Sequence, residues 1–505
     1  MQPQVLIVGA GPTGLALALG LEKQGIPFRI IDKNKGPGEA SRAMTVHARI
    51  LEFYHQFGFV DEIVHSGIPV QQVEIYKDNK QRAKMNLGCI GKGLSPFPYV
   101  LSLPQDEHER ILINQLKAKG ICIEWDTKLI SFHQEEDRVH VITTKQGIEK
   151  KHHYAYLCGC DGAHSSVRKG LGFDFAGGTY EQVFYVADVL SETHIEGLQM
   201  KLFKDGFGLI FPIRTTNSLR LISLVPQALL DKKSEIKFTE IVPYIEANLG
   251  VHTNKVNWFS TYKVHHRVSE HFRKGRVFIA GDAGHVHSPA GGQGMNTGIG
   301  DAINLSWKLA AVLKEKAKEE LLDSYEEERM DFAKNLVATT DRMFSGIVGK
   351  GFSTKMIREV LIPYIVPKMT GISSIRKMLF KTVSQIRIHY RNSMLSTGMA
   401  GAIHGGDRLP WVQGQGGDNF KPLQTFDWQF HVYGEVKVDL RELAKTATIP
   451  LHEFPWTASM KETGMNPGSM FLIRPDGYVA LADSEQDIEK IKAYLNKIEG
   501  SSGLI

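Results

Sequence analysis

The stretch that decides the fold class is GRVFIAGDAGHVHSPAGGQGMNTGIGDAINLSWKL, residues 275–309. Its apolar run 277–280 predicts a buried strand that ends at Gly281-Asp282, so a carboxylate lies at the carboxyl end of that strand. Residues 296–309 predict a helix, and the glycines just before it let a ligand approach bare backbone. The amino end of a helix offers unpaired NH groups and a partial positive charge. We therefore expect this segment to face an anionic or electron-rich group.

The amino terminus carries a dinucleotide-binding fingerprint. Residues 4–8 predict a strand, GAGPTG follows at 9–14, a helix continues to about residue 24, and a second strand at 27–31 ends in Asp32. In this βαβ pattern the first glycine makes a tight turn, the second admits a pyrophosphate, the third allows close packing, and the acid accepts hydrogen bonds from a ribose. The residues expected to bind the dinucleotide here are Gly9, Ala10, Gly11, Pro12, Thr13, Gly14, Asp32 and Lys33.

A third strand-to-helix turn follows the apolar run near residue 156 and contains Asp161-Gly162. A capped turn would explain this pattern by itself. Together with the two turns above, it predicts one α/β nucleotide-binding domain of the Rossmann type, whose sheet is completed by segments far apart in the sequence.

The remaining pattern predicts three further parts. We expect the nucleotide-binding domain to be discontinuous, at 1–70, 100–172 and 271–320, and an antiparallel-sheet substrate domain at 71–99 and 173–270, where residues alternate with period two. A helical segment is expected at 321–403, and a small α/β domain at 404–505 after a glycine-rich linker.

Composition excludes several classes of protein. The 505 residues carry a net charge of +5 without the basic clusters of a nucleic-acid-binding protein. Four cysteines make no disulfide framework, and no zinc spacing is present, so we expect reduced thiols, a cytoplasmic location and no metal site. Residues 351–391 carry eight Lys or Arg against Glu359, a local balance of +7. A helical segment packed on the protein body is the expectation there, with membrane association disfavoured but left open.

Five motifs, in order, resemble those of the group A FAD-dependent aromatic hydroxylases: GAGPTG at 9–14, SRAMTVHAR at 41–49, LPQDEHERIL at 103–112, GCDGAHSSVRK at 159–169, and the segment quoted first. The run RPDGYVA at 474–480 is similar to the thioredoxin-like carboxyl-terminal module of the phenol hydroxylase and polyketide hydroxylase branch. The module here has no CxxC pair, so a redox role is not expected.

The resemblance implies FAD as the bound cofactor and NAD(P)H as the electron donor, NADPH being the preferred expectation. It places Arg42 and Gln105 against the FAD chain, Asp161 in a motif linked to FAD and NAD(P)H, Asp282 on the ribityl hydroxyls, and Pro289 beside the flavin ring. Gly292, Gly294, Met295 and Asn296 form the turn at the flavin, where backbone NH groups would stabilise the negative charge of the reduced ring.

The implied activity is hydroxylation of a phenolic or polycyclic aromatic small molecule with O2 through a flavin hydroperoxide. A flavin reductase or an antibiotic-inactivating monooxygenase on the same fold is the alternative, and a flavin-binding protein without turnover is a third. The catalytic acid or base is not identified; Pro289 is a weak candidate, and the histidines at 265, 266, 285 and 287 are expected to be mainly structural. A homodimer is left open.

Overall fold

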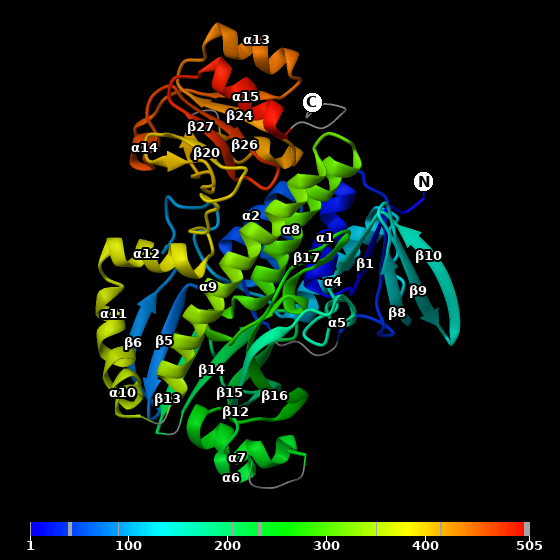
Figure 1. Ribbon diagram of the computed structural model, residues 1–505. Coiled ribbons are helices and arrows are strands. Elements are labelled where there is room, and N and C mark those ends of the chain that lie inside the picture. Colours follow the sequence, from blue (N-terminus) through cyan, green and yellow to red (C-terminus); the bar gives the residue numbers. More distant parts are fainter. Residues whose placement is uncertain are drawn as a thin grey trace.

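The computed structural model (Figure 1) describes residues 2–38, 43–88, 90–204, 206–230, 235–349, 351–414 and 417–498, without the side chains of residues 290, 352 and 353. In it, the amino-terminal fingerprint belongs to a five-stranded sheet. Four strands run parallel in the order β18, β11, β1, β2. Their chain positions confirm that distant segments complete one sheet. The strands are β1 (Val5–Val8), β2 (Phe28–Ile31), β11 (Tyr156–Gly159), β18 (Val277–Ile279) and the antiparallel edge strand β17 (Arg273–Lys274).

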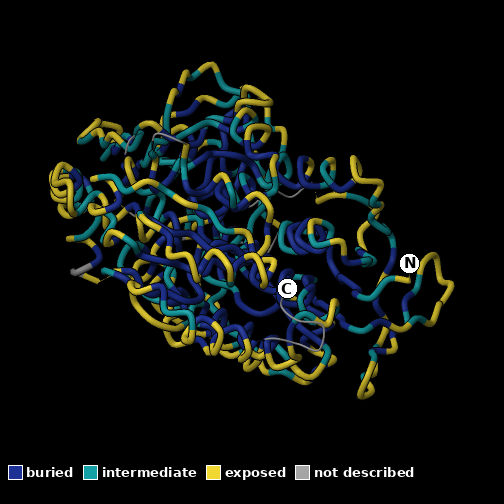
Figure 2. The backbone as a smooth tube through the Cα atoms, turned by 90° about the horizontal axis from the view of Figure 1, so that it is seen from above, coloured by how far each residue is buried: buried dark blue, intermediate teal, exposed yellow. Residues whose placement is uncertain are grey.

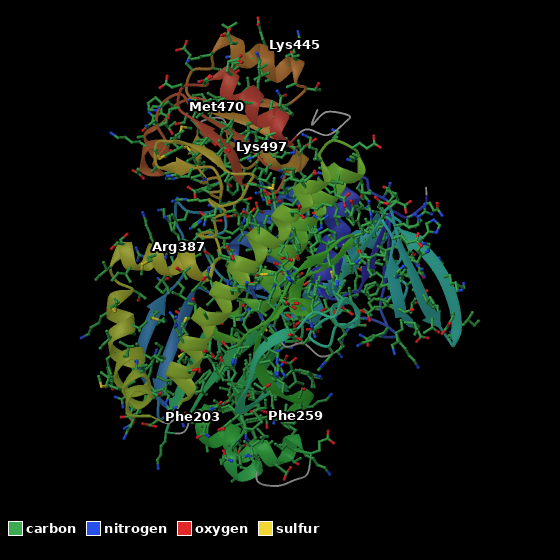
Figure 3. All side chains as sticks on the ribbon, in the orientation of Figure 1. Phe203, Phe259, Arg387, Lys445, Met470 and Lys497 are labelled. Carbon is green, nitrogen blue, oxygen red and sulfur yellow. The ribbon has the colours of Figure 1, made fainter. Side chains whose placement is uncertain are left out.

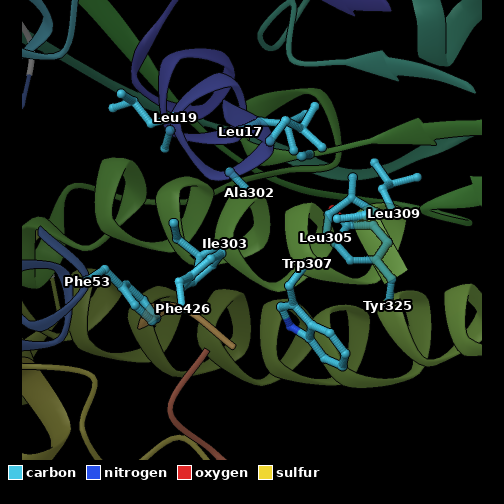
Figure 4. Packing of buried hydrophobic residues seen from close by; sticks show 14 of the residues in the cluster. Leu17, Leu19, Phe53, Ala302, Ile303, Leu305, Trp307, Leu309, Tyr325 and Phe426 are labelled. Carbon is cyan, nitrogen blue, oxygen red and sulfur yellow. The ribbon is translucent and has the colours of Figure 1, made fainter. Parts of the chain in front are cut away.

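Two helices from opposite ends of this domain pack directly on each other. Helix α1 (Pro12–Lys23) crosses α8 (Gly294–Leu313) so closely that a Cβ on Gly20 would lie 2.4 Å from Ser306 Oγ. Figure 4 shows Leu17 and Leu19 of α1 above Ala302 on α8, with Trp307 and Tyr325 on the far side. Because α8 is covered on nearly all sides, its apolar residues do not form a single stripe. The helices α2 (Ala48–Phe57), α3 (Val60–Ser66), α4 (Gln105–Ala118) and α5 (Ser166–Leu171) complete this region.

A three-stranded antiparallel sheet projects from the same region at the right of Figure 1. Its strands are β8 (Thr127–Gln134), β9 (Val139–Lys145) and β10 (Ile148–Tyr154).

An eight-stranded sheet follows, in the order β19-β16-β12-β15-β14-β13-β5-β6. The expected antiparallel pattern holds for all of its pairs except one, since β13 and β5 run parallel. A hairpin fixes antiparallel pairing, whereas β5 reaches β13 from more than a hundred residues earlier in the chain. The strands are β5 (Gln72–Lys77), β6 (Lys80–Asn86), β12 (Phe175–Leu190), β13 (Leu198–Phe203), β14 (Gly206–Ile213), β15 (Ser218–Leu224), β16 (Lys255–Ser269) and β19 (His285–Val286), with helices α6 (Gln227–Leu230) and α7 (Phe238–Leu249) at one end.

Helices then cover the outer side of this sheet. The long helix α9 (Asp323–Val348) runs along β16, and the segment after it lies against β5 and β6 at the left of Figure 1. That segment consists of α10 (Phe352–Met356), the π-helical η4 (Ile357–Ile365), α11 (Val366–Met369) and α12 (Ser373–Val383). None of the helices in the described part of the chain has both the length and the apolarity needed to cross a bilayer.

The carboxyl-terminal domain is built on a six-stranded mixed sheet, in the order β21-β20-β27-β26-β24-β25. Its strand β20 (Thr397–Ala400) precedes residue 404, where the sequence suggested that this domain begins, so the sheet borrows a strand from the expected helical segment. The other strands are β21 (Ile403–His404), β24 (Gln429–Tyr433), β25 (Leu451–Phe454), β26 (Ser469–Ile473) and β27 (Val479–Asp483), and the helices are α13 (Val438–Thr446), α14 (Ala458–Glu462) and α15 (Ile488–Ile498).

A buried charge cluster joins this domain to the rest of the molecule. Arg474, in the turn between β26 and β27, donates to both carboxylate oxygens of Glu328 on α9 at 2.6 and 3.0 Å and also pairs with Asp476. Lys308 on α8 reaches Glu328 at 2.8 Å, and Trp307 donates to Asp476. Figure 2 shows that buried backbone is concentrated in the interior of the molecule and exposed backbone toward its periphery. The domain is therefore fixed on α8 and α9, the helices that support the turn at 281–296.

Candidate functional site

A groove of about 220 Å³ opens at the carboxyl ends of β1, β2 and β11. Ligands bind at this position in doubly wound α/β sheets. Residues from α4 and β8 form its other wall, among them Glu109 and Leu129. Six of the residues expected to bind the dinucleotide line the groove together: Gly9, Ala10, Gly11, Asp32, Lys33 and Asp161.

The three fingerprint glycines have the distinct geometries that a dinucleotide site requires. Gly9 has φ +106°, and a Cβ there would lie 2.3 Å from the carbonyl oxygen of Cys160. A Cβ on Gly14 would lie 1.9 Å from Gly9 O, so this glycine permits the contact between helix and strand. By contrast, no described heavy atom lies within 4 Å of a Cβ built on Gly11. The space beside Gly11 is open for a pyrophosphate.

Asp32 is fixed at the edge of the groove by the backbone. Its carboxylate accepts hydrogen bonds from Ala10 N and Asn34 N, both at 2.8 Å, which leaves further lone pairs for a ribose hydroxyl. Lys33 beside it is exposed.

Asp161 has a different use. Its carboxylate accepts hydrogen bonds from the Ser165 hydroxyl and from the backbone NH groups of Ser166 and Val167 at the start of α5. The capped turn considered for this segment is therefore what the structure shows, and Asp161 shapes the groove through that turn.

The Gly-Asp turn after β18 is clamped between two helices. Gly281 has φ +61°, and a Cβ on Gly281 or on Gly298 of α8 would lie 2.4 Å from Thr13 Oγ1. The side chain of Thr13 is thus committed to packing, and the NH groups of Thr13 and Gly14 precede the first intrahelical bond of α1, which Leu15 donates to Gly11 O. Asp282 lies on the exposed side of this turn.

A buried carboxylate supports the turn from below. Asp301 on α8 is fully buried and accepts hydrogen bonds from Gly281 N at 3.0 Å and His285 Nε2 at 2.7 Å on one oxygen, and from Arg329 Nε at 2.6 Å on the other. Burial alone would raise the pKa of Asp301, but the charge of Arg329 and the contact with His285 hold it below its usual value. The position of the Gly-Asp turn therefore depends on an ionised group that lies behind it.

The glycine turn at 291–296 is tied to the segment 43–47. Gly291 and Gly292 have φ +78° and +61°. Thr45 Oγ1 and Asn296 Nδ2 donate to Gly292 O at 3.1 and 2.9 Å, and His47 Nε2 lies 3.0 Å from Gly291 O. Burial lowers the pKa of His47 to about 4, so the ring is neutral and donates from Nε2.

The start of α8 presents backbone rather than side chains. The first intrahelical bond of α8 is donated by Thr297 to Gln293 O, so the NH groups of Gly294, Met295 and Asn296 precede it. The side chain of Asn296 is fully buried, and it donates to Thr45 O and accepts from His47 N. Asn296 therefore acts on a ligand only through its NH group.

The remaining expected residues lie around the groove and the 291–296 turn. Met295 Sδ lies 3.3 Å from His108 Nδ1, away from the helix end, and burial lowers the pKa of that histidine to about 3. Pro289 is exposed and precedes the 291–292 turn, and Pro12 occupies the first position of α1. Arg42 lies outside the described residues.

Gln105 links the groove to the segment 43–47, which is bonded to the 291–296 turn. It accepts a hydrogen bond from Ala43 N at 3.3 Å and donates to Glu109 at 2.8 Å. Burial raises the pKa of Glu109 to about 7, although the bond from Gln105 lowers it. The sequence did not single out Glu109, Thr45 and His47, although Thr45 and His47 lie in the motif at 41–49 and Glu109 in the motif at 103–112.

An apolar face of the eight-stranded sheet begins beside the segment 43–47, which bonds to the turn at 291–296. Met44, next to Thr45, belongs to a buried cluster between this sheet and α9 that includes Phe184, Phe211 and Phe344. At its edge, Tyr180 donates to Asp341 on α9 and lies 4.7 Å from the ring of His266, centroid to centroid. On β15, Arg220 is buried and pairs with both oxygens of Asp188, at 2.7 and 2.6 Å.

The four candidate histidines have different surroundings. His285 is buried on Asp301, and His265 lies 2.7 Å from Thr179 Oγ1. Burial lowers the pKa of His287 to about 4, and its Nδ1 lies 2.8 Å from Ser288 O. His287 is therefore neutral at physiological pH, and His285 is committed to the support of the turn.

Comparisons with known proteins agree with this arrangement. Residues 2–340 match the family model described as an FAD binding domain. The chain is 30% identical to 6-methylpretetramide 4-monooxygenase of Streptomyces rimosus over 98% of this chain and 93% of that protein, and 31% identical to pentachlorophenol 4-monooxygenase of Sphingobium chlorophenolicum over 69% and 65%. The solved structure of the flavin-dependent monooxygenase PieE in complex with FAD and substrate has the same fold, with a TM-score of 0.79 at 19% identity over 96% of each chain. The groove, the turns and these matches together show that the chain belongs to the FAD-binding-domain family and is an FAD-dependent monooxygenase of the aromatic hydroxylase group.

Proposed function

We propose that this enzyme hydroxylates a polycyclic aromatic compound held against the apolar face of the eight-stranded sheet. The observation that carries the proposal is the continuity between the two parts of the site. Thr45 bonds to the glycine turn, while its neighbour Met44 packs with Phe184 and Phe211 on the sheet. A flat apolar substrate on that face would lie next to the 291–296 turn.

The proposed cofactor residues divide into two groups. Gly9, Gly11 and Asp32 would hold the adenosine and pyrophosphate half of FAD, since they line the groove and leave open space beside Gly11. Asp282 would hold the ribityl chain, and the NH groups at 294–296 would face the electron-rich edge of the ring. Bound FAD would supply the transfer of electrons from NAD(P)H to O2.

This chain's own residues would exclude water from the reacting region. The cluster around Phe184 and Phe344 is apolar and buried, and the backbone NH groups at the start of α8 are fixed in place by Asn296 and Thr45. A water-free pocket favours oxygen transfer to substrate over release of hydrogen peroxide.

The preference for a polycyclic substrate rests on the extent of similarity. The relative that acts on 6-methylpretetramide matches along 98% of this chain, whereas the relative that acts on pentachlorophenol matches along 69%. We also propose that the carboxyl-terminal domain is a thioredoxin-like module with a structural role, because residues 397–498 contain no cysteine.

The Asp282→Ala variant tests the cofactor assignment. Loss of hydrogen bonds from a charged acceptor is expected to weaken FAD binding by about 10- to 100-fold. Asp137→Ala is the matched control, because that carboxylate is 62% exposed and, among the residues that the structure describes, forms an ion pair with its neighbour Arg138 alone. Equal FAD affinity in both variants, measured by flavin fluorescence, would remove Asp282 from the site.

Substrate class is tested with the wild-type protein. NAD(P)H oxidation and oxygen uptake are measured with a set of single-ring phenols and a set of tetracyclic phenols, and oxygen from labelled O2 is sought in the product. Stimulation by tetracyclic compounds with incorporation of label supports the proposal. Coupled turnover of single-ring phenols alone would contradict it.

A further inference from the structure

Exposed apolar side chains gather on one part of this molecule. Among the described residues, fifteen large apolar side chains are exposed, and ten of them lie between Met343 and Leu379. Monomeric proteins usually expose such residues singly, and a contiguous group marks a binding surface. The ten are Met343, Met356, Val360, Leu361, Tyr364, Ile365, Met369, Ile372, Met378 and Leu379.

Their spacing places most of them on one side of the α10–α11 segment. From Met356 to Ile372 the exposed apolar residues recur every three or four positions, often as adjacent pairs such as Val360-Leu361 and Tyr364-Ile365. The opposite side of the segment is used for folding: Pro363 is buried, and Ile362 packs with Val73 and Ile75 of β5. The segment thus has an inner face on the sheet and a second apolar face toward solvent.

Basic side chains surround this outer face. Lys355, Lys368, Lys377 and Lys381 are all exposed. Lys355 has only Glu359 at 4.0 Å, and the other three form no ion pair with any residue that the structure describes. We call these four lysines and the apolar residues from Met356 to Leu379 the basic apolar face. Figure 3 shows the side chains of α10 to α12 projecting outward at the left of the molecule.

We propose that the basic apolar face binds peripherally to the surface of an anionic lipid bilayer. Aliphatic side chains on a surface helix enter the boundary between headgroups and acyl chains, and lysines around them are attracted to anionic headgroups. The sequence favoured a packed helical segment over membrane association. The structure adds that this helical segment is packed on one side only.

Other occupants fit the charge and composition less well. A second copy of the chain would bring together two faces that each belong to a segment with a local balance of +7. A protein partner typically selects faces rich in aromatic residues and poor in lysine, and Tyr364 is the one aromatic residue among the ten. The FAD groove lies by β8, on the other side of the molecule from this face, so a bilayer would leave it open (Figure 1).

The first test uses the full-length wild-type protein loaded with FAD. Flotation is measured with vesicles of phosphatidylcholine alone and of phosphatidylcholine with about 30% phosphatidylglycerol. We expect at least about tenfold stronger partition onto the anionic vesicles, with most of it lost in about 0.5 M NaCl because salt screens the lysines. Equal, weak flotation with both vesicles would overturn the proposal without reference to any variant.

Two pairs of substitutions then locate the contact. Lys377→Gln with Lys381→Gln is expected to weaken partition by about 30-fold, and Leu361→Gln with Ile365→Gln by a similar factor. The matched controls lie elsewhere on the surface, Lys445→Gln with Lys461→Gln and Ile148→Gln with Val438→Gln, and are expected to float like wild type. Flotation of the patch variants at the wild-type level would overturn the assignment.

Sedimentation of the same proteins without lipid distinguishes membrane binding from self-association through this face. A wild-type dimer that the Leu361→Gln, Ile365→Gln protein loses would assign the face to a second copy and refute the membrane proposal. FAD content is recorded for every variant and is expected to equal that of wild type, because none of these residues lines the groove.

Discussion

The Asp301→Asn substitution tests whether the Gly-Asp turn is held by the charge behind it. Asp301 is fully buried, and its three hydrogen-bond partners are all donors: Gly281 N, His285 Nε2 and Arg329 Nε. An asparagine has nearly the same shape but turns one acceptor oxygen into an NH2 group. That group must face either Arg329 or the pair formed by Gly281 and His285.

The expected loss follows from burial. Removing one partner of a buried ion pair leaves an uncompensated charge and typically costs about 3–5 kcal/mol, and Arg329 is 1% exposed. Arg329 keeps bonds to Tyr390 OH and Thr297 O, so we expect the lower end of that range, about 3 kcal/mol. Displacement of the Gly281 turn, at about 1 kcal/mol for one hydrogen bond, weakens FAD binding about fivefold.

The pH dependence has a defined sign. Because the pKa of Asp301 is lowered in the folded protein, its contribution is complete above the ordinary carboxyl pKa and is lost as the pH falls through the lowered value. The wild-type protein is therefore expected to lose stability in acid more steeply than Asp301→Asn.

Urea unfolding followed by circular dichroism, with flavin fluorescence for FAD affinity, measures both effects. Asp323→Asn is the control. The Asp323 carboxylate, at the start of α9, also pairs with an arginine, Arg273, but it is 67% exposed, so its loss is expected to cost less than about 1 kcal/mol. If Asp301→Asn and Asp323→Asn unfold at the same urea concentration and bind FAD equally, the supporting role of Asp301 is refuted.

The other predictions concern the groove. Gly9→Ala is expected to destabilise the FAD-free protein by more than about 2 kcal/mol, since its Cβ would overlap Cys160 O at 2.3 Å. Gly11→Ala is expected to leave the unfolding midpoint unchanged and to lower FAD affinity, because its Cβ points into open space. The reverse pattern in thermal melts and FAD titrations would contradict the roles assigned to these glycines. Burial raises the pKa of Glu109 from 4.5 to about 7, so its contribution to the free energy of unfolding is fully present below pH 4.5 and is lost, by about 3 kcal/mol, as the pH rises through 7. Glu109→Gln is expected to abolish this loss. Identical pH profiles of unfolding for the two proteins would show that Glu109 titrates normally.

Much of the nucleotide domain could be predicted from the sequence. Gly9 and Gly14 were identified from the spacing of the fingerprint and Gly281 from its place at the end of an apolar strand, and in the structure each occupies a place where a side chain would collide with a neighbour. The strands β1, β2, β11 and β18 were found because short apolar runs flanked by glycine and acid are local signals. The parallel pairing of β5 with β13 was not found, since the direction of a strand pair between distant segments leaves no trace in either segment.

The hydrogen-bond partners of polar side chains could not be predicted from the sequence either. Asn296 was expected to act on the flavin through its backbone NH, and the sequence did not show that its side chain joins α8 to Thr45 and His47, about 250 residues away. Asp161 was expected in a cofactor motif and lines the groove, but the bonds from its carboxylate to the start of α5 were visible only in the structure. A polar side chain in a motif has several possible partners, and the closest donor in space decides among them.

The sequence by itself determined the FAD-binding fold, because glycines with positive φ, short apolar strands and helix starts are properties of neighbouring residues. Only the tertiary structure decided how the site is supported and what surrounds it. The Asp301 and Arg329 pair, the Arg474 and Glu328 contact across 146 residues, and the outward face of the 356–379 segment all depend on which distant surfaces meet. Burial of a charge and exposure of an apolar side chain are relations between elements, so they are fixed only when the chain has folded.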